Sequence, residues 1–488
     1  MEEKTQGKKL LKTVSSCSNI DSEYEFCLNN RPDNFVSGKI ATHINEWRNI
    51  TSDFNILSYV KGYKIEFEDQ PHQINIPRQI NFNDEERHII ENEIQKLLLV
   101  NVIEKVLDSG KRDEFISNIF IRPKKNGTYR MNLNLKLLKC NVEYHHFKME
   151  TFKSAVNLVT RDCWFGSIDL TDAYYSCNVD KYNRRFLRFI WEGQKYQYTC
   201  LPNGLASAPR IFTKIMKPVF STLRKKGQAN VSYIDDSLVV SRTKAECVDN
   251  IHETVQLLYS LGLTVHPEKS VLRPTKCITF LGFWIDSVEM KITLTNEKAK
   301  AIVQLGNEIL QTELVVIRKL AQLIGQLVAS ELGVNYAPLY YKLLEIEKDD
   351  ALKQNYGNFE AKLKLSDEGR SCIQWWIDNV ESRFKLIEIP EPVLILKSDS
   401  SMYAWGCINE TTGECTRDTW SEIEQQCHIN YLELKAGFLS IKHFCKNTKN
   451  CHIQLYMDNT VAVTYINKMG GNIKTLNDLT RQIWHWCV

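Results

Sequence analysis

The sequence predicts an α+β protein of more than one domain, and three observations lead to this prediction. At 488 residues the chain is longer than one hydrophobic core usually organises, so roughly two to four domains are expected. Short strand-like runs are mixed with helical patterns between residues 83 and 294. A second mixed series of strands and helices follows a proline-containing break near residue 390, which indicates a separate α+β region.

Composition excludes several classes of protein. Lys and Arg total 62 against 59 Asp and Glu, so any surface for nucleic acid must be a local patch rather than a global charge. Fifteen cysteines without a C-x-x-C pair fit neither a disulfide framework nor a zinc ribbon, and favour a reduced, intracellular protein. The charged opening from Met1 to Lys12 and the lack of a run of about 18 apolar residues predict no signal peptide and no membrane span. A soluble protein of the cytoplasm or nucleus is expected.

The first elements differ sharply in composition. Residues 1–34 are polar and predict a disordered segment, and residues 35–85 are expected to form an N-terminal extension. A helix is predicted from Asn83 to Val100, because acids occupy its first turn and apolar residues follow at helical spacing.

The middle of the chain predicts a series of strands and one long helix. Asn126-Gly127 is a strong turn signal between the first two strands, because both residues tolerate positive φ. Strands are expected at Phe115–Arg122, Tyr129–Leu135, Trp164–Leu170, Arg185–Trp191 and Tyr196–Cys200, a helix at 208–225, a hairpin around Asp235, and a β pair at Ile278–Asp286 and Lys291–Leu294.

The last third of the chain predicts a helical region and then a second mixed domain. Residues 296–345 carry long aliphatic stripes, and Glu388–Pro392 is the candidate linker. After it, strands are expected at 393–396, at two places within 405–420 and at 452–457, with helices at 430–445 and 460–468. This order is βββαβα.

Two adjacent carboxylates stand at the tip of the predicted hairpin, in Tyr233-Ile234-Asp235-Asp236. Like charges on a tight turn repel each other and favour a bound cation. Asp169 ends an apolar strand, so it could face the hairpin and complete a two-metal site for in-line phosphoryl transfer. Taken alone, Asp169 would more often be a helix cap.

An ordered set of motifs resembles the reverse transcriptase family over residues 86–290. The set consists of Arg122–Arg130 as the fingers hairpin, Asp169–Tyr174, Leu201–Pro209, Tyr233–Asp236 and Gly262–Lys269 as the four palm motifs, and Phe280–Phe283 as the primer grip. The resemblance implies a right-hand polymerase, with fingers and palm at residues 86–290 and a helical thumb or connection with linker at 291–390. It implies an RNA-directed DNA polymerase that uses an RNA template, a DNA or RNA primer, RNA:DNA hybrids and deoxynucleoside triphosphates. Two Mg²⁺ ions, with Mn²⁺ as a substitute, are the implied cofactors.

The same resemblance implies roles for individual residues. The implied catalytic residues are Asp169, Asp235, Asp236 and Lys269, the metal ligands Asp169, Leu170 and Asp235, the nucleotide-binding residues Lys124, Lys125, Arg130, Asp172, Ala173, Tyr174 and Asn203, and the primer grip Phe280, Leu281 and Gly282.

Several of these assignments have a plain alternative. Lys124, Lys125 and Arg130 would face a triphosphate, although a basic turn is otherwise a solvated feature. Tyr174 resembles the steric gate against a ribose 2′-hydroxyl, but a Tyr in this setting is more often a core residue.

Three further positions have roles that the resemblance defines less directly. Lys269 resembles the proton donor to pyrophosphate, or is an exposed loop lysine. Asn203 stands where retroviral enzymes carry Gln, and Asp236 is expected to support Asp235 rather than bind metal directly. Within the family the closest resemblance is to DIRS-type retroelements, on Leu201–Arg210, the Trp47–Phe67 segment and Asn467–Gly471.

A second set of acids resembles the RNase H core over residues 391–488. Asp399 follows a strand, Glu433 lies on the next helix and Asp458 ends the following strand; two further metal ions are implied there. The family uses a fourth acid on a later helix, and Asp478 comes too early to serve. An incomplete domain with impaired RNase H activity is therefore expected, in a fragment of a longer polyprotein that includes other domains or in a truncated genomic copy.

Two other classes compete with the polymerase. A host-retained, catalytically silent relic would keep the nucleic-acid groove, but the metal ligands here are intact. An RNA-dependent RNA polymerase shares the palm acids, but Tyr174 and the RNase H-like region count against it.

Overall fold

The computed structural model describes residues 35–107, 114–123, 127 and 129–488. Contacts divide the chain into two compact units, Met1–Ile278 and Thr279–Val488, which are described in turn. The predicted disordered segment 1–34 and the turn residues Lys124 and Lys125 lie outside the described residues. None of the described helices combines the length and apolar character that crossing a membrane requires.

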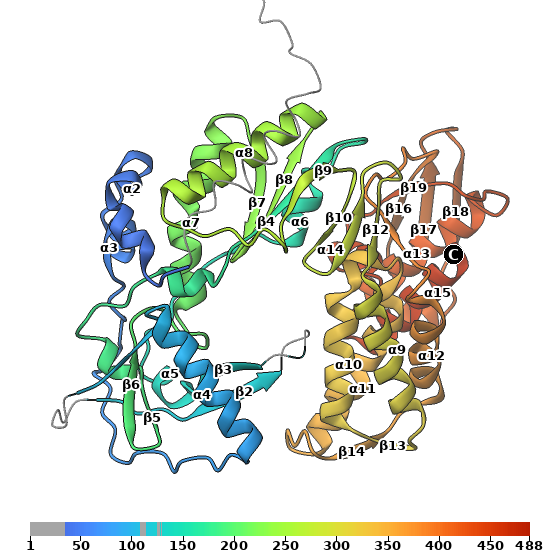
Figure 1. Ribbon diagram of the computed structural model, residues 1–488. Helices are drawn as coiled ribbons and strands as arrows, with labels where there is room; N and C mark the ends of the chain where they lie inside the picture. The colour runs from blue at the N-terminus through green and yellow to red at the C-terminus, as the bar shows by residue number, and fades with distance from the viewer. Residues whose placement is uncertain (1–34, 108–113, 124–126, 128) are drawn as a thin grey trace, which may run out of the picture. The chain divides into compact units, whose positions relative to one another are not determined.

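A four-stranded antiparallel sheet of order β7-β8-β4-β9 forms the palm of the first unit (Figure 1). Its strands are β4 (Trp164–Asp169), β7 (Ala229–Tyr233), β8 (Asp236–Ser241) and β9 (Val271–Thr275). Helices α7 (Ala208–Lys225) and α8 (Lys244–Ser260) pack against it. The packing is close at Gly166, where an added Cβ would lie 2.5 Å from Ile251 Cδ1. A larger residue where α8 crosses β4 would therefore force Ile251 to shift.

The part of the first unit that is predicted to form the fingers contains a three-stranded sheet and a hairpin. The elements are α4 (Asp84–Leu99), β1 (Ile103–Lys105), β2 (Ile119–Pro123), β3 (Tyr129–Leu133), α5 (Lys136–Lys139), η3 (Arg184–Phe186), β5 (Arg188–Trp191) and β6 (Gln194–Tyr198), whereas α6 (Phe152–Val156) lies against β7. The predicted helix from Asn83 is confirmed, and Asn83 and Glu86 form a capping box at its start. The predicted hairpin is confirmed as the antiparallel pair β2 and β3.

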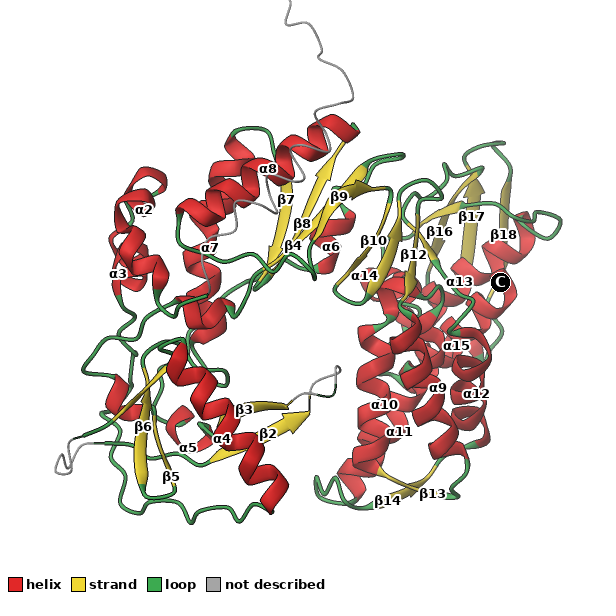
Figure 2. Cartoon of the chain, viewed as in Figure 1, coloured by secondary structure: helices red, strands yellow, loops and turns green. Residues whose placement is uncertain are grey.

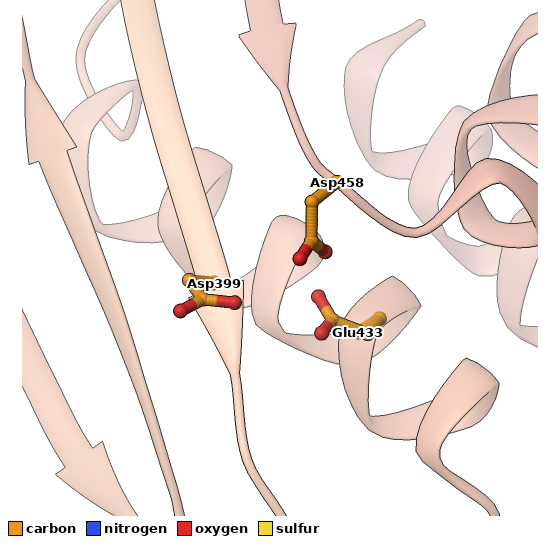
Figure 3. A group of neighbouring side chains, drawn as sticks. All are labelled: Asp399, Glu433 and Asp458. Atoms are coloured by element: carbon orange, nitrogen blue, oxygen red, sulfur yellow. The ribbon is translucent and has the colours of Figure 1, made fainter.

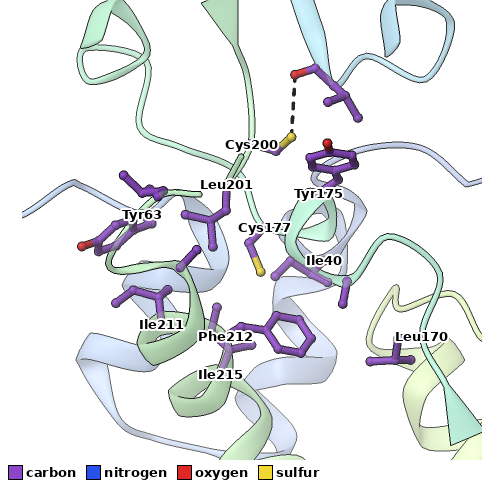
Figure 4. Packing of buried hydrophobic residues seen from close by; sticks show 14 of the residues in the cluster. Ile40, Tyr63, Leu170, Tyr175, Cys177, Cys200, Leu201, Ile211, Phe212 and Ile215 are labelled. Carbon is purple, nitrogen blue, oxygen red and sulfur yellow. Dashed lines mark hydrogen bonds between the residues drawn. The ribbon is translucent and has the colours of Figure 1, made fainter. Parts of the chain in front are cut away.

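The N-terminal extension is folded onto this unit. It contains η1 (Lys39–His43), α2 (Ile44–Ile50) and α3 (Phe54–Lys61). Trp47 is fully buried, and its indole Nε1 donates a hydrogen bond to the carbonyl of Leu261, 3.0 Å away. One hydrophobic cluster contains Ile40 and Tyr63 of the extension together with Leu201, Ile211 and Phe212 of the palm (Figure 4). The extension is thus part of the same core as the palm.

The second unit begins with a four-stranded sheet of order β10-β11-β12-β15 and a group of helices. These elements are β10 (Cys277–Phe280), β11 (Phe283–Asp286), β12 (Lys291–Leu294), α9 (Asn296–Leu310), β13 (Leu314–Val316), α10 (Ile317–Ala329), η4 (Glu331–Gly333), η5 (Ala337–Tyr340), α11 (Lys342–Gln354), β14 (Lys362–Lys364), α12 (Asp367–Asn379) and β15 (Lys385–Leu386). Figure 2 shows α9 to α12 running beside one another, in agreement with their contacts.

Three details of the prediction are wrong. The single strand expected at Ile278–Asp286 is two strands, because Leu281 and Gly282 adopt positive φ angles of 49° and 79° and turn the chain. The helical stretch expected at 296–345 is interrupted by β13, and its helices continue to Asn379. Helix α8 was not predicted, although its Thr243 and Glu246 form a capping box.

The last part of the second unit confirms the βββαβα order. It consists of β16 (Leu394–Ser400), β17 (Ala404–Asn409), β18 (Cys415–Thr419), η6 (Glu424–Gln426), α13 (Ile429–Phe444), β19 (Ile453–Tyr456), α14 (Thr460–Asn467) and α15 (Lys474–Cys487). The sheet order is β18-β17-β16-β19, with β16 and β19 parallel. The strand expected to end at Leu396 is longer and includes Asp399.

Helix α15 joins this part to the helical part of the second unit. The ring of Trp484 lies 5.9 Å from that of Tyr336, and the ring of His485 lies 5.9 Å from that of Tyr340. Arg481 Nη1 lies 3.5 Å from a carboxylate oxygen of Glu368. These contacts explain why both parts belong to one compact unit.

Candidate active site

The hairpin of β7 and β8 places the first two acids. Tyr233 pairs with Asp236, so Ile234 and Asp235 form a two-residue loop between the strands. Ile234 has a φ of 57°, a strained conformation for a β-branched residue, and such strain concentrates at functional sites. Asp235 is exposed at the loop, whereas Asp236 is already the first residue of β8.

Strand pairing brings Asp169 to this loop. The last residue of β4, Asp169, is the partner of Asp236 in the β4–β8 register. The backbone N–H of Leu170 donates to the carbonyl of Asp235 at 3.0 Å, which fixes the loop against the end of β4. Three carboxylates therefore meet at one end of the palm sheet.

The electrostatics of this group favour a cation. Burial raises the pKa of Asp169, and burial together with the charges of Asp235 and Asp169 raises the pKa of Asp236 to about 6. Asp169 Oδ1 is buried and accepts no hydrogen bond from any described residue, while Lys269 Nζ lies 3.8 Å from it. A buried carboxylate oxygen without a donor fits a hard divalent cation, which prefers oxygen ligands.

Two residues that the motif analysis did not assign hold Asp169 in place. The backbone N–H of Asp169 donates to Ser270 Oγ at 3.0 Å, and Ser270 Oγ in turn donates to the carbonyl of His266 at 2.7 Å. The carbonyl of Asp169 accepts from the N–H of His266 at 2.7 Å. The sequence signal for both residues is their position: His266 lies within the fourth motif, and Ser270 directly follows it.

Tyr174 lies close to the acids. It is half-buried in η2 (Ala173–Ser176), and its ring makes an edge-on contact with Phe212 at 5.7 Å between centroids. Burial and the charge of Asp235 raise the pKa of Tyr174 to about 12. The ring therefore lies within electrostatic range of the carboxylates. Ala173, from the same short helix, is buried.

The buried Tyr175 is hydrogen-bonded to one of the predicted nucleotide-binding residues, and the motif analysis missed it. Asn203 Nδ2 donates to the Tyr175 hydroxyl at 3.0 Å. Burial raises the pKa of Tyr175, the charge of Asp172 raises it further and that of Arg130 opposes the rise. Asn203 thus contacts this phenol directly, and the charges of Asp172 and Arg130 act on it.

The predicted primer grip belongs to the second unit. Phe280 is buried at the end of β10, and Leu281 and Gly282 form the turn to β11. Lys298 Nζ donates to the carbonyl of Leu281 at 3.0 Å and stabilises this turn. Its relation to the acids of the first unit stays a prediction.

A second acidic group lies in the last part of the chain (Figure 3). One ligand oxygen from each of Asp399, Glu433 and Asp458 lies within 4.8 Å of the others. Asp399 and Asp458 are exposed, whereas Glu433 is 4% exposed and its Oε2 has no hydrogen-bond partner among the described residues. Burial, followed by the charges of Asp458 and Asp399, raises the pKa of Glu433 to about 7. This group also fits a divalent cation, and Asp478 on α15 is not part of it.

Comparison with known proteins supports the motif analysis. Residues 122–285 match the family described as "Reverse transcriptase (RNA-dependent DNA polymerase)". The chain is 24% identical over 416 residues to the "Enzymatic polyprotein" of Cauliflower mosaic virus (strain CM-1841), covering 81% of this chain and 58% of that protein. It is 27% identical over 193 residues to the "Gag-Pol polyprotein" of Avian reticuloendotheliosis virus, covering 37% of this chain and 16% of that protein. The chain thus spans only part of the polyproteins that it matches.

The fold is shared with solved structures. A foamy viral protease-reverse transcriptase in complex with double-stranded DNA matches with a TM-score of 0.56 and 17% identity, over 99% of this chain and 82% of that chain. The foamy viral protein in complex with an RNA/DNA hybrid matches with a TM-score of 0.54 and 17% identity, over 98% of this chain and 63% of that one. The chain therefore has the right-hand polymerase fold of reverse transcriptases, and its residues 122–285 match the reverse transcriptase family.

Proposed function

We propose that this chain is the RNA-directed DNA polymerase of a retroelement, which adds deoxynucleotides to a primer 3′-hydroxyl on an RNA or DNA template. The observation that carries the proposal is the meeting of Asp169, Asp235 and Asp236 at one end of the palm sheet, within the segment that matches the reverse transcriptase family. Acids in this arrangement suit two-metal phosphoryl transfer.

Asp169, Asp235 and the backbone carbonyl of Leu170 would hold two divalent ions, with Mg²⁺ as the expected ion and Mn²⁺ as a substitute. Bound there, such ions lower the pKa of the attacking hydroxyl and stabilise charge on the phosphate. The side chain of Leu170 is apolar and buried, so only its carbonyl can serve as a ligand. Asp236 supports the other two acids from β8.

The other assigned residues would bind and select the nucleotide. Tyr174 would exclude a ribose 2′-hydroxyl, because its ring lies near Asp235 and is held by Phe212. Lys269 would protonate the leaving pyrophosphate, since it is close to Asp169 and largely exposed. Arg130, Asp172, Ala173 and Asn203, with Lys124 and Lys125, would bind the triphosphate and sugar, and Phe280, Leu281 and Gly282 would grip the primer.

RNA template, primer, RNA:DNA hybrid and deoxynucleoside triphosphates are the proposed partners. The related foamy viral structures contain double-stranded DNA and an RNA/DNA hybrid, which supports nucleic-acid partners for this chain. The proposed partners also include other domains of a retroelement polyprotein, which the motifs suggest is of DIRS type. The cysteine pattern favours a protein that acts inside the cell.

Residues 391–488 would form an RNase H-like domain, after fingers and palm at 86–290 and a helical thumb or connection at 291–390. Asp399, Glu433 and Asp458 would bind two ions and cleave the RNA strand of a hybrid. The described residues supply three carboxylates where the resemblance implies four, so weak cleavage is proposed.

Primer extension on an RNA template with Mg²⁺ tests the polymerase. The unmodified chain should extend the primer, and Asp235→Asn should not. Absence of extension by both proteins, despite binding of an RNA:DNA hybrid, would instead identify a silent nucleic-acid-binding relic.

A further inference from the structure

The segment Tyr63–Glu68 lies outside the reverse transcriptase match and has no assigned role. It is hydrogen-bonded on both sides by backbone groups. Tyr63 N–H donates to the carbonyl of Asn178 at 2.8 Å, and Glu143 N–H donates to the carbonyl of Glu66 at 3.0 Å. The segment therefore joins two separate parts of the first unit.

The carboxylate of Glu66 is the partner of a buried cation. Glu66 Oε2 pairs with Arg210 Nη2 and lies 3.1 Å from His145 Nε2. The Arg210 side chain is only 5% exposed, against 31% for Glu66. A buried guanidinium that loses its carboxylate is left as an uncompensated charge. Breaking this ion pair is therefore expected to destabilise the folded protein.

The position of Arg210 in its helix makes this pair important. Arg210 lies in the first turn of α7. A positive charge is unfavourable there, because the N-terminal end of the helix dipole is also positive. The first turn of α7 contains no acid, and Ser207 does not cap it with its side chain. Glu66 therefore supplies from the N-terminal extension the negative charge that α7 itself lacks.

The start of α7 bears on the proposed nucleotide site. Phe212, two residues beyond Arg210, contacts the ring of Tyr174. The loop just before the helix carries Asn203, which donates to Tyr175. Tyr63 also belongs to the cluster that contains Leu201 and Ile211 (Figure 4).

We propose that Glu66 is a positioning residue for the incoming nucleotide. Through Arg210 it fixes the first turn of α7, and this turn fixes Tyr174 by way of Phe212 and Asn203 by way of the preceding loop. This inference rests on the proposed polymerase function, because only that function makes Tyr174 and Asn203 part of a nucleotide site.

Steady-state primer extension with Glu66→Gln tests the role. The KM for deoxynucleoside triphosphates should rise about tenfold while kcat changes by less than about threefold, since the reacting acids stay in place. Glu114→Gln is the matched control, because Glu114 pairs with Arg188, which is 8% exposed, elsewhere in the unit. The control should leave the KM unchanged. If Glu66→Gln does not fold, Glu66→Asp keeps the charge and should raise the KM about threefold.

Hydrogen exchange of residues 201–212 separates this inference from the proposed function. Exchange should be faster in the Glu66 variant than in the unmodified chain and the Glu114 variant. If the unmodified chain extends no primer, the proposed function fails, and this exchange result alone decides whether Glu66 fixes the turn. Unchanged exchange, or equal rises in KM for the Glu66 and Glu114 variants, would overturn the inference.

Discussion

The two acidic groups of this chain are assembled in different ways. In the first unit, Asp169 and Asp236 are paired residues of neighbouring strands, and Asp235 occupies the loop between β7 and β8. In the second unit, Asp399, Glu433 and Asp458 come from a strand, a helix and the residues after another strand. The first geometry is fixed by strand register, and the second by the packing of α13 on its sheet. A one-residue slip of β8 against β4 would separate Asp236 from Asp169, and a slip of β16 would turn Asp399 away from Glu433.

The two groups also differ in how they balance charge without an ion. Lys269 lies 3.8 Å from Asp169, so a side chain offsets part of the repulsion in the first group. Protonation relieves repulsion in both groups, because the pKa of Asp236 is raised to about 6 and that of Glu433 to about 7. A metal should therefore stabilise the second group most clearly at high pH.

The largest expected effect separates the two groups by activity. Asp235→Asn should lower primer extension by about a thousandfold or more, because a metal ligand and its charge are lost. Cleavage of the RNA strand of a hybrid should not change. Asp249→Asn, at an exposed position on α8, is the control, and comparable extension by the Asp235 and Asp249 variants would remove Asp235 from the site.

The converse change addresses the second group. Glu433→Gln should reduce any cleavage of the hybrid by about a hundredfold and leave primer extension intact. Release of labelled RNA fragments measures this change. Cleavage that is robust and independent of Glu433 would show that the second group is not the nuclease site.

A smaller effect is expected on the choice of sugar. Tyr174→Ala should lower discrimination against ribonucleotides by about 10- to 100-fold, because the ring beside Phe212 is removed. The ratio of kcat/KM for deoxynucleotides and ribonucleotides measures it. Tyr182→Ala, at a position that is 82% exposed, is the control. Unchanged sugar discrimination would disprove the assignment of Tyr174.

The smallest effect is on stability and depends on pH. Because the folded pKa of Glu433 is raised above 4.5, the folded state binds the proton more tightly, and stability is lost as pH rises from about 4.5 through about 7. Without divalent ions, Glu433→Gln should be more stable than the unmodified chain by about 2 kcal/mol at pH 8 and equal to it at pH 4. Denaturant unfolding at the two pH values measures this. A pH-independent difference would indicate a packing effect instead.

Local patterns predicted the elements that carry the acids, and long-range contacts explain what was missed. Helix α7 was predicted with its observed bounds, and the β7–β8 hairpin was expected from two apolar runs around a turn. The pair of Glu66 and Arg210 was not predictable, because 144 residues separate its members and no local pattern indicates which distant residues meet. The hydrogen bond from Asn203 to Tyr175 was missed for the same reason. The break at Leu281 was missed because a positive φ at leucine has no sequence signature.

The absence of a side chain at Gly166 has a mechanical consequence. The side chain of Ile251 on α8 occupies the space where a Cβ would lie, so the helix packs directly on the strand at this point. Gly166 is three residues before Asp169 on the same strand. A side chain at Gly166 would therefore have to displace Ile251, and it would do so three residues from the acid that ends β4.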